Sequence, residues 1–431
     1  MTSKKEFDAA GIFLHSLSEA SSPSHWRLQQ TILSNFNNLN AWTLLNELTQ
    51  NAVDTEATAV KIKLHPDGLE FRHNGKEPLD QRSVEGLCAF SMSTKGLDSV
   101  GFMGIGFKSF IRFFHKVTIY DQGIRFAIDL KLKKNGNPDL VDLYHPQWVE
   151  NCEVVDGETV FRFSNPQGDA METLREDLEN FDSIRLAVLG MRGLEKVSID
   201  DVVYKIEKID NGVGISLGEQ PPRMFTILEE EVNMVGDAFK ELILVRNVDD
   251  VGVETSTTRK VRLVKEYKLE FSEEDGKTIS SIKPTKMDSG QAFCLVPLEG
   301  FTFPFKFGLD ADWLLMPDRT KFHTDARHWN QQILSVIPIL IRKYIQSLSK
   351  EELGVEGWAK CLDIFPDEEN EHTGPLKYLD SDQFKELMKE ELAEINFIRC
   401  RDGEFRNPRD TRDFPHIRTP YPRMKIPTYK Q

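Results

Sequence analysis

The sequence lacks several features that whole classes of protein require. Its five cysteines are scattered and odd in number, and none forms a Cys-x-x-Cys pair, which argues against a disulfide framework and against a zinc module. No apolar run approaches the roughly 20 residues that cross a bilayer, and the first residues lack the apolar core of a secretory signal. We therefore expect a cytoplasmic protein in a reducing compartment, with no membrane partner.

Positive charge is also scarce. Lys and Arg number 54 and Asp and Glu number 69, so the formal net charge is −15. Such a molecule as a whole repels nucleic acid, and nucleic-acid contact would need a local basic patch. Length and apolar content are ordinary, since the chain has 431 residues, of which 39% are hydrophobic. These values predict two or three soluble domains.

A glycine-rich stretch at residues 101–109 is the first feature that points to chemistry. It holds three glycines that let a ligand approach the backbone, and one lysine that adds a positive charge: Gly101, Gly104, Gly106 and Lys108. The apolar run from Ser109 to Phe114 predicts a helix whose N-terminus would offer unpaired N–H groups to phosphate. The spacing fits neither the P-loop nor the dinucleotide fingerprint, so this stretch alone leaves a phosphate site and a plain tight turn open.

Residues 41–55 predict a helix with an apolar stripe that contains Trp42, Leu44, Leu45, Leu48 and Ala52. Off that stripe, Glu47, Asn51 and Asp54 are spaced i, i+4 and i+7, so they lie on one face. Glu47 can take a proton from water, and the Asn51 carbonyl oxygen can hold a hard cation. The alternative is an ordinary solvated polar face, which the helix by itself favours.

The residues after this helix predict a hairpin of strands 59–64 and 69–72, with Pro66 and Gly68 in its turn. The second strand ends in the turn His73-Asn74-Gly75, and a loop of small residues contains Ser93-Thr94-Lys95. Further along we expect a short helix at 80–87, strands at 116–120, 124–130, 159–163 and 193–199, and a helix at 172–190.

The order of these motifs resembles the Bergerat-fold, or GHKL, ATPases, which include the ninety-kilodalton heat-shock chaperone, MutL, the ATPase component of DNA gyrase, MORC proteins and sensor histidine kinases. Within that group the chain is most similar to sacsin-type ATP-binding modules. They share the His-Asn-Gly-Lys turn, a helix like Glu85-Gly-Leu-Cys88, the Ser-Thr-Lys loop and the run Gly-Ile-Gly-Phe-Lys-Ser. The resemblance covers residues about 26 to 200 and implies an α/β sandwich with helices on one mixed sheet.

The resemblance implies roles residue by residue, with ATP and Mg²⁺ as the ligands. Glu47 matches the glutamate that activates the attacking water, Asn51 matches the Mg²⁺ ligand, and Asp54 lies beside them. Thr159 matches the strand threonine at the base of the adenine pocket. The phosphate loop and its lid correspond to Ser93, Thr94, Lys95, Gly101, Phe102, Met103, Gly104, Ile105, Gly106, Phe107 and Lys108. These residue types also suit phosphoryl transfer, which needs mainly positioning and charge neutralisation.

One position departs from the superfamily pattern. Most members have an aspartate where this chain has His73, and that aspartate accepts the adenine amino group. A histidine can accept it only as the neutral tautomer, and Asn74, between His73 and Gly75, would be a substitute acceptor. The alternative is that His73 only caps the end of the strand.

Beyond residue 200 the chain predicts a second α+β unit, with strand-like segments at 203–206, 241–245, 260–264 and 292–296. Residues 305–320, followed by Trp329-Asn330 and a helix at 331–348, resemble a segment of sacsin-type chains. In GHKL ATPases this domain is a transducer, and the resemblance implies that Arg319 reaches the γ-phosphate. An ion pair of Arg319 with Asp312 or Asp318 is the alternative.

We therefore predict three parts: an ATP-binding domain at 1–200, a transducer-like domain at 201–349 and an extension at 350–431. The extension should hold a helix at 382–394, a hairpin at 397–405 and a basic, proline-rich tail. Such a tail suits nucleic acid or an acidic partner, or is a solvated linker.

The leading hypothesis for function is a Mg²⁺-dependent ATPase whose domains close as a clamp, in a homodimer, on a protein client or on nucleic acid. The alternative is a nucleotide sensor without turnover that regulates an effector partner, for example in an anti-phage system. A histidine kinase is disfavoured because no phosphoacceptor helix is evident.

Overall fold

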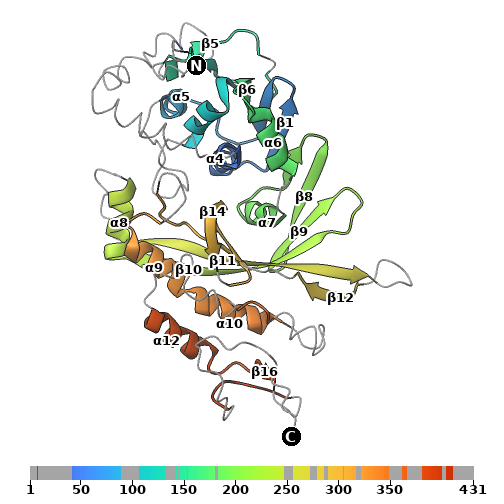
Figure 1. The fold of residues 1–431 in the computed structure, drawn as a ribbon, viewed down its shortest axis with the longest axis vertical. Helices are drawn as coiled ribbons and strands as arrows, with labels where there is room; N and C mark the ends of the chain where they lie inside the picture. Colours follow the sequence, from blue (N-terminus) through green and yellow to red (C-terminus); the bar gives the residue numbers. More distant parts are fainter. Residues whose placement is uncertain are drawn as a thin grey trace. The chain divides into compact units, whose positions relative to one another are not determined.

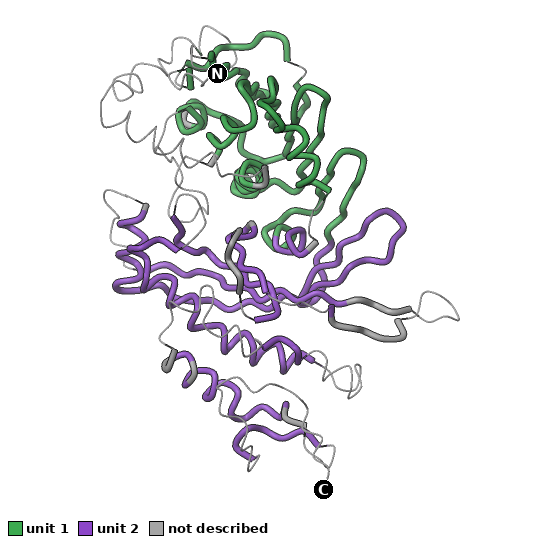
Figure 2. The backbone as a smooth tube through the Cα atoms, in the orientation of Figure 1, with its two compact units in different colours: residues 1–182, 189–206 green, residues 183–188, 207–431 purple. Residues whose placement is uncertain are grey.

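We analysed a computed structural model of the chain, which divides into two compact units. Figure 2 colours them: one comprises residues 1–182 and 189–206, the other residues 183–188 and 207–431. The described residues are 7, 41–88, 106–132, 142–143, 145–152, 154–179, 183–246, 256–271, 279–285, 290–303, 305–316, 322–348, 362–365, 381–399 and 404–410. They form a mixed α/β protein with a large mixed sheet, and none of their helices is long and apolar enough to cross a membrane.

The first unit is built on a run of short strands. They are β1 (Ala59–His65), β2 (Gly68–His73), β3 (Phe114–Tyr120), β4 (Arg125–Asp129), β5 (Gln147–Trp148), β6 (Thr159–Pro166), β7 (Lys196–Ile199) and β8 (Val202–Ile209), the last of which belongs to this unit up to Ile206. Their order is β8-β7-β1-β2-β6-β3-β4-β5. The β1–β7 pair is parallel and the others are antiparallel.

The strands predicted from alternating apolar residues are confirmed in this unit. The expected hairpin joins β1 to β2, and its last pair is His65 opposite Gly68. A Cβ atom on Gly68 would lie 1.9 Å from the carbonyl oxygen of Phe163 on β6, so the close approach of these two strands requires glycine there.

One face of this sheet, which we call the helix face, is covered by helices. Cross-strand pairing puts its side chains on β2 and β6: Leu69, Phe71, His73, Thr159, Phe161 and Phe163, all of them buried. Among its described residues, the helices of the unit are α4 (Ala41–Asp54), α5 (Gln81–Cys88), the 3₁₀-helix η1 (Gly106–Arg112), α6 (Ala170–Glu179) and α7 (Ser183–Met191), which the two units share. Rings of η1 lie on those of β6, and α4 packs against η1. Helix α4 also packs against α6 (Figure 1).

Two helix predictions in this region are wrong in detail. The apolar run from Ser109 is not the start of an α-helix, because residues 106–112 form η1 and β3 begins at Phe114. Buried phenylalanines recur at 107, 110 and 113, and a spacing of three is the repeat of a 3₁₀-helix. The single helix expected at 172–190 is two helices, α6 and α7.

The second unit has a sheet of its own strands. They are β9 (Gly212–Leu217), β10 (Arg223–Val235), β11 (Ser256–Phe271), β12 (Ile279–Pro284), β13 (Gly290–Cys294), β14 (Val296–Phe303) and β15 (Gly308–Asp310). Their order is β14-β13-β15-β11-β10-β9, and β12 also pairs with β11. The helices and the small hairpin are α8 (Asp237–Arg246), α9 (Arg327–Ser335), α10 (Ile337–Ser347), α12 (Ser381–Leu392), β16 (Ile398–Arg399) and β17 (Phe405–Arg406).

The strand predicted at 241–245 is wrong, since these residues belong to helix α8. Gly236 has a φ of 60° and ends β10, and Asp237 then supplies an acidic side chain at the positive end of the helix. The Glu241 carboxylate accepts the backbone N–H groups of His328 and Trp329 at 3.1 and 2.7 Å, so α8 caps the first turn of α9. The helix expected at 331–348 is interrupted at Val336, after which α10 begins at Ile337 with Pro338 in its first turn.

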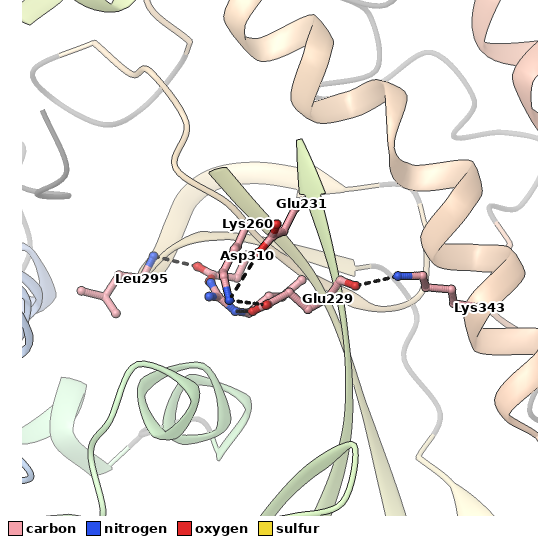
Figure 3. Close-up of polar contacts among 7 residues, drawn as sticks. Glu229, Glu231, Lys260, Leu295, Asp310 and Lys343 are labelled. Atoms are coloured by element: carbon pink, nitrogen blue, oxygen red, sulfur yellow. Dashed lines mark hydrogen bonds and ion pairs between the residues drawn. The ribbon is translucent and has the colours of Figure 1, made fainter. Parts of the chain in front are cut away.

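The long strand β11 carries charged side chains into the interior of the second unit. Arg262 donates one hydrogen bond to Asp310 on β15 at 3.0 Å and one to Glu229 on β10 at 2.8 Å. Asp310 is 1% exposed, and its second oxygen accepts the backbone N–H of Leu295 at 2.9 Å. Lys260 forms a second ion pair with Glu229, at 2.6 Å, and lies 3.9 Å from Glu231 (Figure 3). Burial alone would raise the pKa of Glu229, but the hydrogen bond from Lys260 and the charge of Arg262 outweigh burial and lower it.

We expect Asp310→Ala to lower the free energy of unfolding by about 3–5 kcal/mol, because it removes one of the two carboxylates that pair with buried Arg262 and leaves the Leu295 N–H without its acceptor. Urea unfolding followed by tryptophan fluorescence measures the effect. Lys240→Ala, which breaks the exposed ion pair with Asp237, is the matched control and should leave the unfolding midpoint unchanged. Equal unfolding midpoints for Asp310→Ala and the wild type would contradict the stabilising role given to Asp310.

Candidate functional site

Helix α4 is enclosed almost all the way round. The predicted apolar stripe is confirmed for Leu44, Leu45, Leu48 and Ala52, all at 0–1% exposure, while the side chain of Trp42 lies outside the described residues. Three polar residues of the helix, Asn46, Thr49 and Gln50, are buried as well. Four of the half-buried positions, Thr43, Glu47, Asn51 and Asp54, therefore form one partly open face, and half-buried Val53 lies apart from it.

This face is not a fully solvated one, which was the alternative for Glu47, Asn51 and Asp54. None of the three is among the exposed residues, and each interacts with other groups of the protein. A carboxylate, an amide and a second carboxylate on an otherwise buried helix are a set of hard oxygen donors at the edge of the packed layer.

The turn His73-Asn74-Gly75 packs against the end of α4. The N–H of Lys76 donates to the carbonyl oxygen of Thr55, the residue that follows the helix, at 2.8 Å. A Cβ atom on Gly75 would lie 2.2 Å from the Thr55 hydroxyl oxygen and 2.9 Å from Nδ1 of His73. Only glycine allows the turn and the helix end to approach this closely.

His73 and Thr159 are brought together by the strand register. They are directly opposite each other on β2 and β6, and both are buried, at 5% and 4% exposure. The imidazole stacks on Phe161, with ring centroids 6.1 Å apart and an interplanar angle of 27°. Two residues that are 86 positions apart in the sequence thus lie side by side on the helix face.

The protonation of His73 follows from its surroundings. Burial lowers the pKa of its imidazole to about 4, so the ring is neutral at pH 7. Nδ1 accepts the backbone N–H of Gly75 at 3.1 Å, which assigns the single ring hydrogen to Nε2. His73 therefore presents a hydrogen-bond donor, Nε2–H. Within the described ranges this group donates no hydrogen bond.

Asn74 has a different environment. Its side-chain oxygen accepts the backbone N–H groups of Thr58 and Ala59 at 3.0 and 2.7 Å, and its amide nitrogen donates to the Thr58 hydroxyl. Through these three bonds the exposed Asn74 side chain holds the turn to the start of β1. The expected role of Asn74 as a substitute acceptor stays a prediction, and it would require Asn74 to give up one of these bonds.

Lys108 is fully buried in η1. Its Nζ donates to the carbonyl oxygen of Gly86, in the last turn of α5, at 2.7 Å. Burial lowers the pKa of this amine to about 7, while the nearby Cys88 thiol, whose pKa burial raises to about 12, acts weakly in the opposite direction. In this arrangement the lysine ties η1 to α5. This contact was missed from the sequence, which contains no local signal for it.

The remaining predicted positions lie outside the described residues. They are Ser93, Thr94, Lys95, Gly101, Phe102, Met103, Gly104, Ile105 and Arg319. Gly106 is the first residue of η1, and Phe107 is buried against Phe110 and Phe161. Asp312, one possible partner of Arg319, lies 3.6 Å from the Arg259 guanidinium.

Another residue missed from the sequence is Asp121, which organises the loop after β3. Its carboxylate accepts the backbone N–H groups of Gly123 and Ile124 at 2.8 Å and that of Leu79 at 2.6 Å. The first two bonds are a local turn that an Asp-x-Gly sequence indicates. The third, 42 positions away, holds the segment that enters α5.

Comparison with known proteins adds little to these observations. Neither a protein family nor a curated protein matches the sequence. Among solved structures, the N-terminal domain of a DNA repair protein has 12% identity and a TM-score of 0.33 and covers 71% of this chain and 96% of its own. The B-subunit of the DNA gyrase from Myxococcus xanthus has 12% identity and a TM-score of 0.35 and covers 71% and 89%. These scores are too low to carry an assignment.

Gly75→Ala should lower the free energy of unfolding by about 1–3 kcal/mol, because the new methyl group overlaps Thr55 and the His73 ring. Thermal or urea unfolding of the purified chain tests this. Gly123→Ala is the control, since a Cβ atom there meets its nearest neighbour at 3.7 Å, an ordinary contact. If both substitutions leave stability unchanged, the turn is not held as tightly as described.

Proposed function

We propose that the first unit is an ATP-binding module of the GHKL type that hydrolyses ATP in the presence of Mg²⁺. The observation that carries the proposal is the grouping of residues from separate motifs. The His73–Thr159 pair lies on the helix face, and the turn that follows His73 packs against the end of α4, the helix that carries Glu47 and Asn51. If these residues had only the local structural roles named as alternatives above, nothing would require them to lie close together.

The residues of α4 fit a magnesium ion that is bound partly by the protein and partly by the phosphates of a nucleotide. Mg²⁺ prefers oxygen donors and is usually held by one or two protein groups together with phosphates and water. Asn51 would supply the protein oxygen. Within the described ranges no group of three or more His, Cys, Asp or Glu residues is arranged to hold a metal alone, so a bound ion would need the phosphates as further ligands.

Glu47, one turn before Asn51, would act as the general base. A carboxylate in this position can orient a water molecule and accept its proton, while the bound ion would neutralise charge on the phosphates. The finer expectations are also part of this proposal: a sacsin-like clamp in a homodimer, Arg319 as a γ-phosphate ligand from the transducer-like unit, and a protein or nucleic-acid client.

The proposal predicts different defects for the two α4 residues. Glu47→Gln should bind ATP normally and turn it over about 10²–10⁴-fold more slowly, because it removes only the base. Asn51→Ala should lose the Mg²⁺ dependence of binding. Binding by fluorescence with a labelled ATP analogue and phosphate release measure the two quantities. Glu56→Gln, which affects only the exposed pair with Lys76 just after α4, is the control. Wild-type turnover in Glu47→Gln would contradict the base assignment.

A nucleotide sensor without turnover is the second candidate. The observation that favours it is the buried bond from Lys108 to Gly86, which keeps this amine on a carbonyl oxygen instead of on a phosphate. Mg²⁺-dependent binding by the wild-type chain with no phosphate release would favour the sensor.

The tautomer of His73 bears on which base is bound. An Nε2–H group cannot accept the adenine 6-amino group, but it can donate to N1 of adenine or to the 6-oxo oxygen of hypoxanthine. We therefore expect affinities for ATP and ITP within about tenfold of each other, since one neutral hydrogen bond contributes about 0.5–1.5 kcal/mol.

His73→Asp should restore an acceptor and shift the preference towards ATP. Competition binding with ATP and ITP measures the ratio, and nitrogen-15 NMR of the histidine ring reports the tautomer of the wild type independently. A wild type that strongly prefers ATP, or a ring hydrogen found on Nδ1, would contradict this interpretation.

A further inference from the structure

The face of the first unit's sheet opposite the helix face carries a set of exposed cations. Cross-strand pairing puts them on one side of five neighbouring strands, in the order β8, β7, β1, β2 and β6. We call this the basic face, and its exposed members are Lys61, Lys63, Arg162, Lys196 and Lys205. Arg72, half-buried, lies on the same side opposite Lys61.

Like charges meet directly on this face. Lys196 of β7 is the cross-strand partner of Lys205 of β8, and Lys61 of β1 is the partner of Arg72 of β2. Directly opposed like charges destabilise a sheet, and a salt-bridged surface would avoid them. Arg72 has acidic partners of its own, but within the described ranges the Lys196–Lys205 pair has none, which points to a bound anion as its counter-charge.

The acidic side chains on the same side offset only part of this charge: Glu70 is the cross-strand partner of both Lys63 and Arg162, and Glu207 lies two positions from Lys205 on β8. Glu70 and Glu158 pair with Arg72, and Asp129 pairs with Lys116. Within the described ranges none of the five exposed cations has an ion pair, although the chain as a whole has a net charge of −15. An acidic protein with such a face has a local basic patch of the kind that contact with a polyanion requires.

We propose that the basic face binds the phosphate backbone of a nucleic acid without regard to sequence. Five strands about 4.8 Å apart spread the cations over roughly 20 Å, a length along which duplex DNA presents about one charge every 1.7 Å. The paired positions between the cations hold no exposed aromatic side chain on which bases could stack, so the contacts are with phosphates.

The same positions argue against a membrane as the partner. Their apolar side chains are Ala59 and Val203, which are half-buried, and Val160, which is buried. Stable attachment to a bilayer needs apolar insertion or an acyl chain in addition to charge. The nucleic-acid assignment is independent of the proposed ATPase activity, because it uses the other side of the sheet and none of the residues assigned to the nucleotide.

The test uses the full chain and labelled 20-base-pair DNA duplexes of two unrelated sequences, in fluorescence anisotropy from about 50 to 200 mM salt. We expect equal affinity for both duplexes and a steep loss of affinity with salt. In Lys61→Glu/Lys196→Glu the slope of log K against log salt should shrink by about two, one unit for each lost phosphate contact. Each substitution also turns a like-charged cross-strand pair into an opposite one, so the double variant should unfold at the same or a higher temperature than the wild type.

Lys240→Glu/Lys389→Glu is the control, because it makes the same change in net charge at exposed positions of the second unit. It should bind DNA nearly as the wild type does. Absence of DNA binding at about 50 mM salt, or equal loss of affinity in both double variants, would overturn the proposal. Tighter binding to polyglutamate or to phosphatidylserine vesicles than to DNA would assign the face to an acidic protein or to a membrane and would also overturn it. ATP binding measured in parallel separates failure of this proposal from failure of the nucleotide site.

Discussion

The register of β2 between β1 and β6 is the constraint on which the first unit depends. Because side chains alternate along a strand, this register sends Phe71 and His73 to the helix face and Glu70 and Arg72 to the opposite side. A slip of one residue would exchange the two sets and bury charge under the helices. The close approach of Gly68 to the Phe163 carbonyl and of Gly75 to Thr55 fixes both ends of β2. The proposed nucleotide site and the basic face therefore follow from one pairing.

The second unit has to accommodate buried positive charge, since its long central strand β11 brings Arg259, Arg262 and Lys265 into the interior. Each has an oxygen partner: Arg259 donates to Thr257 and the Thr258 carbonyl, Arg262 to Asp310, and Lys265 to the Lys306 carbonyl. Such bonds hold a strand in one register, because a shifted strand would leave a charge buried without a partner. Lys343 of α10 also donates to the Glu229 carbonyl, which joins the helix layer to this group (Figure 3).

The sequence predicted much of the first unit and less of the second. Alternation and turn chemistry identified β1 to β4 and β6, and the period of α4 identified its buried stripe, because these signals are local. The run at 241–245 is apolar enough for a strand, but the positive φ of Gly236 and the contact of Glu241 with the start of α9 make it helical. The adjacency of His73 and Thr159 came from resemblance, whereas the Lys108 contact and the basic face depend on pairings between distant segments that no local pattern reveals.

Charge is distributed unequally between the two sides of the first unit's sheet. On the helix side, desolvation lowers the pKa of His73 to about 4 and of Lys108 to about 7, so burial keeps the imidazole neutral and weakens the positive charge of the lysine at pH 7. On the opposite side the lysines are exposed. A triphosphate bound on the helix side would thus gain little positive charge from the side chains of His73 and Lys108. Its neutralisation would have to come from backbone N–H groups and a divalent ion, which is why the proposed activity should depend strictly on Mg²⁺.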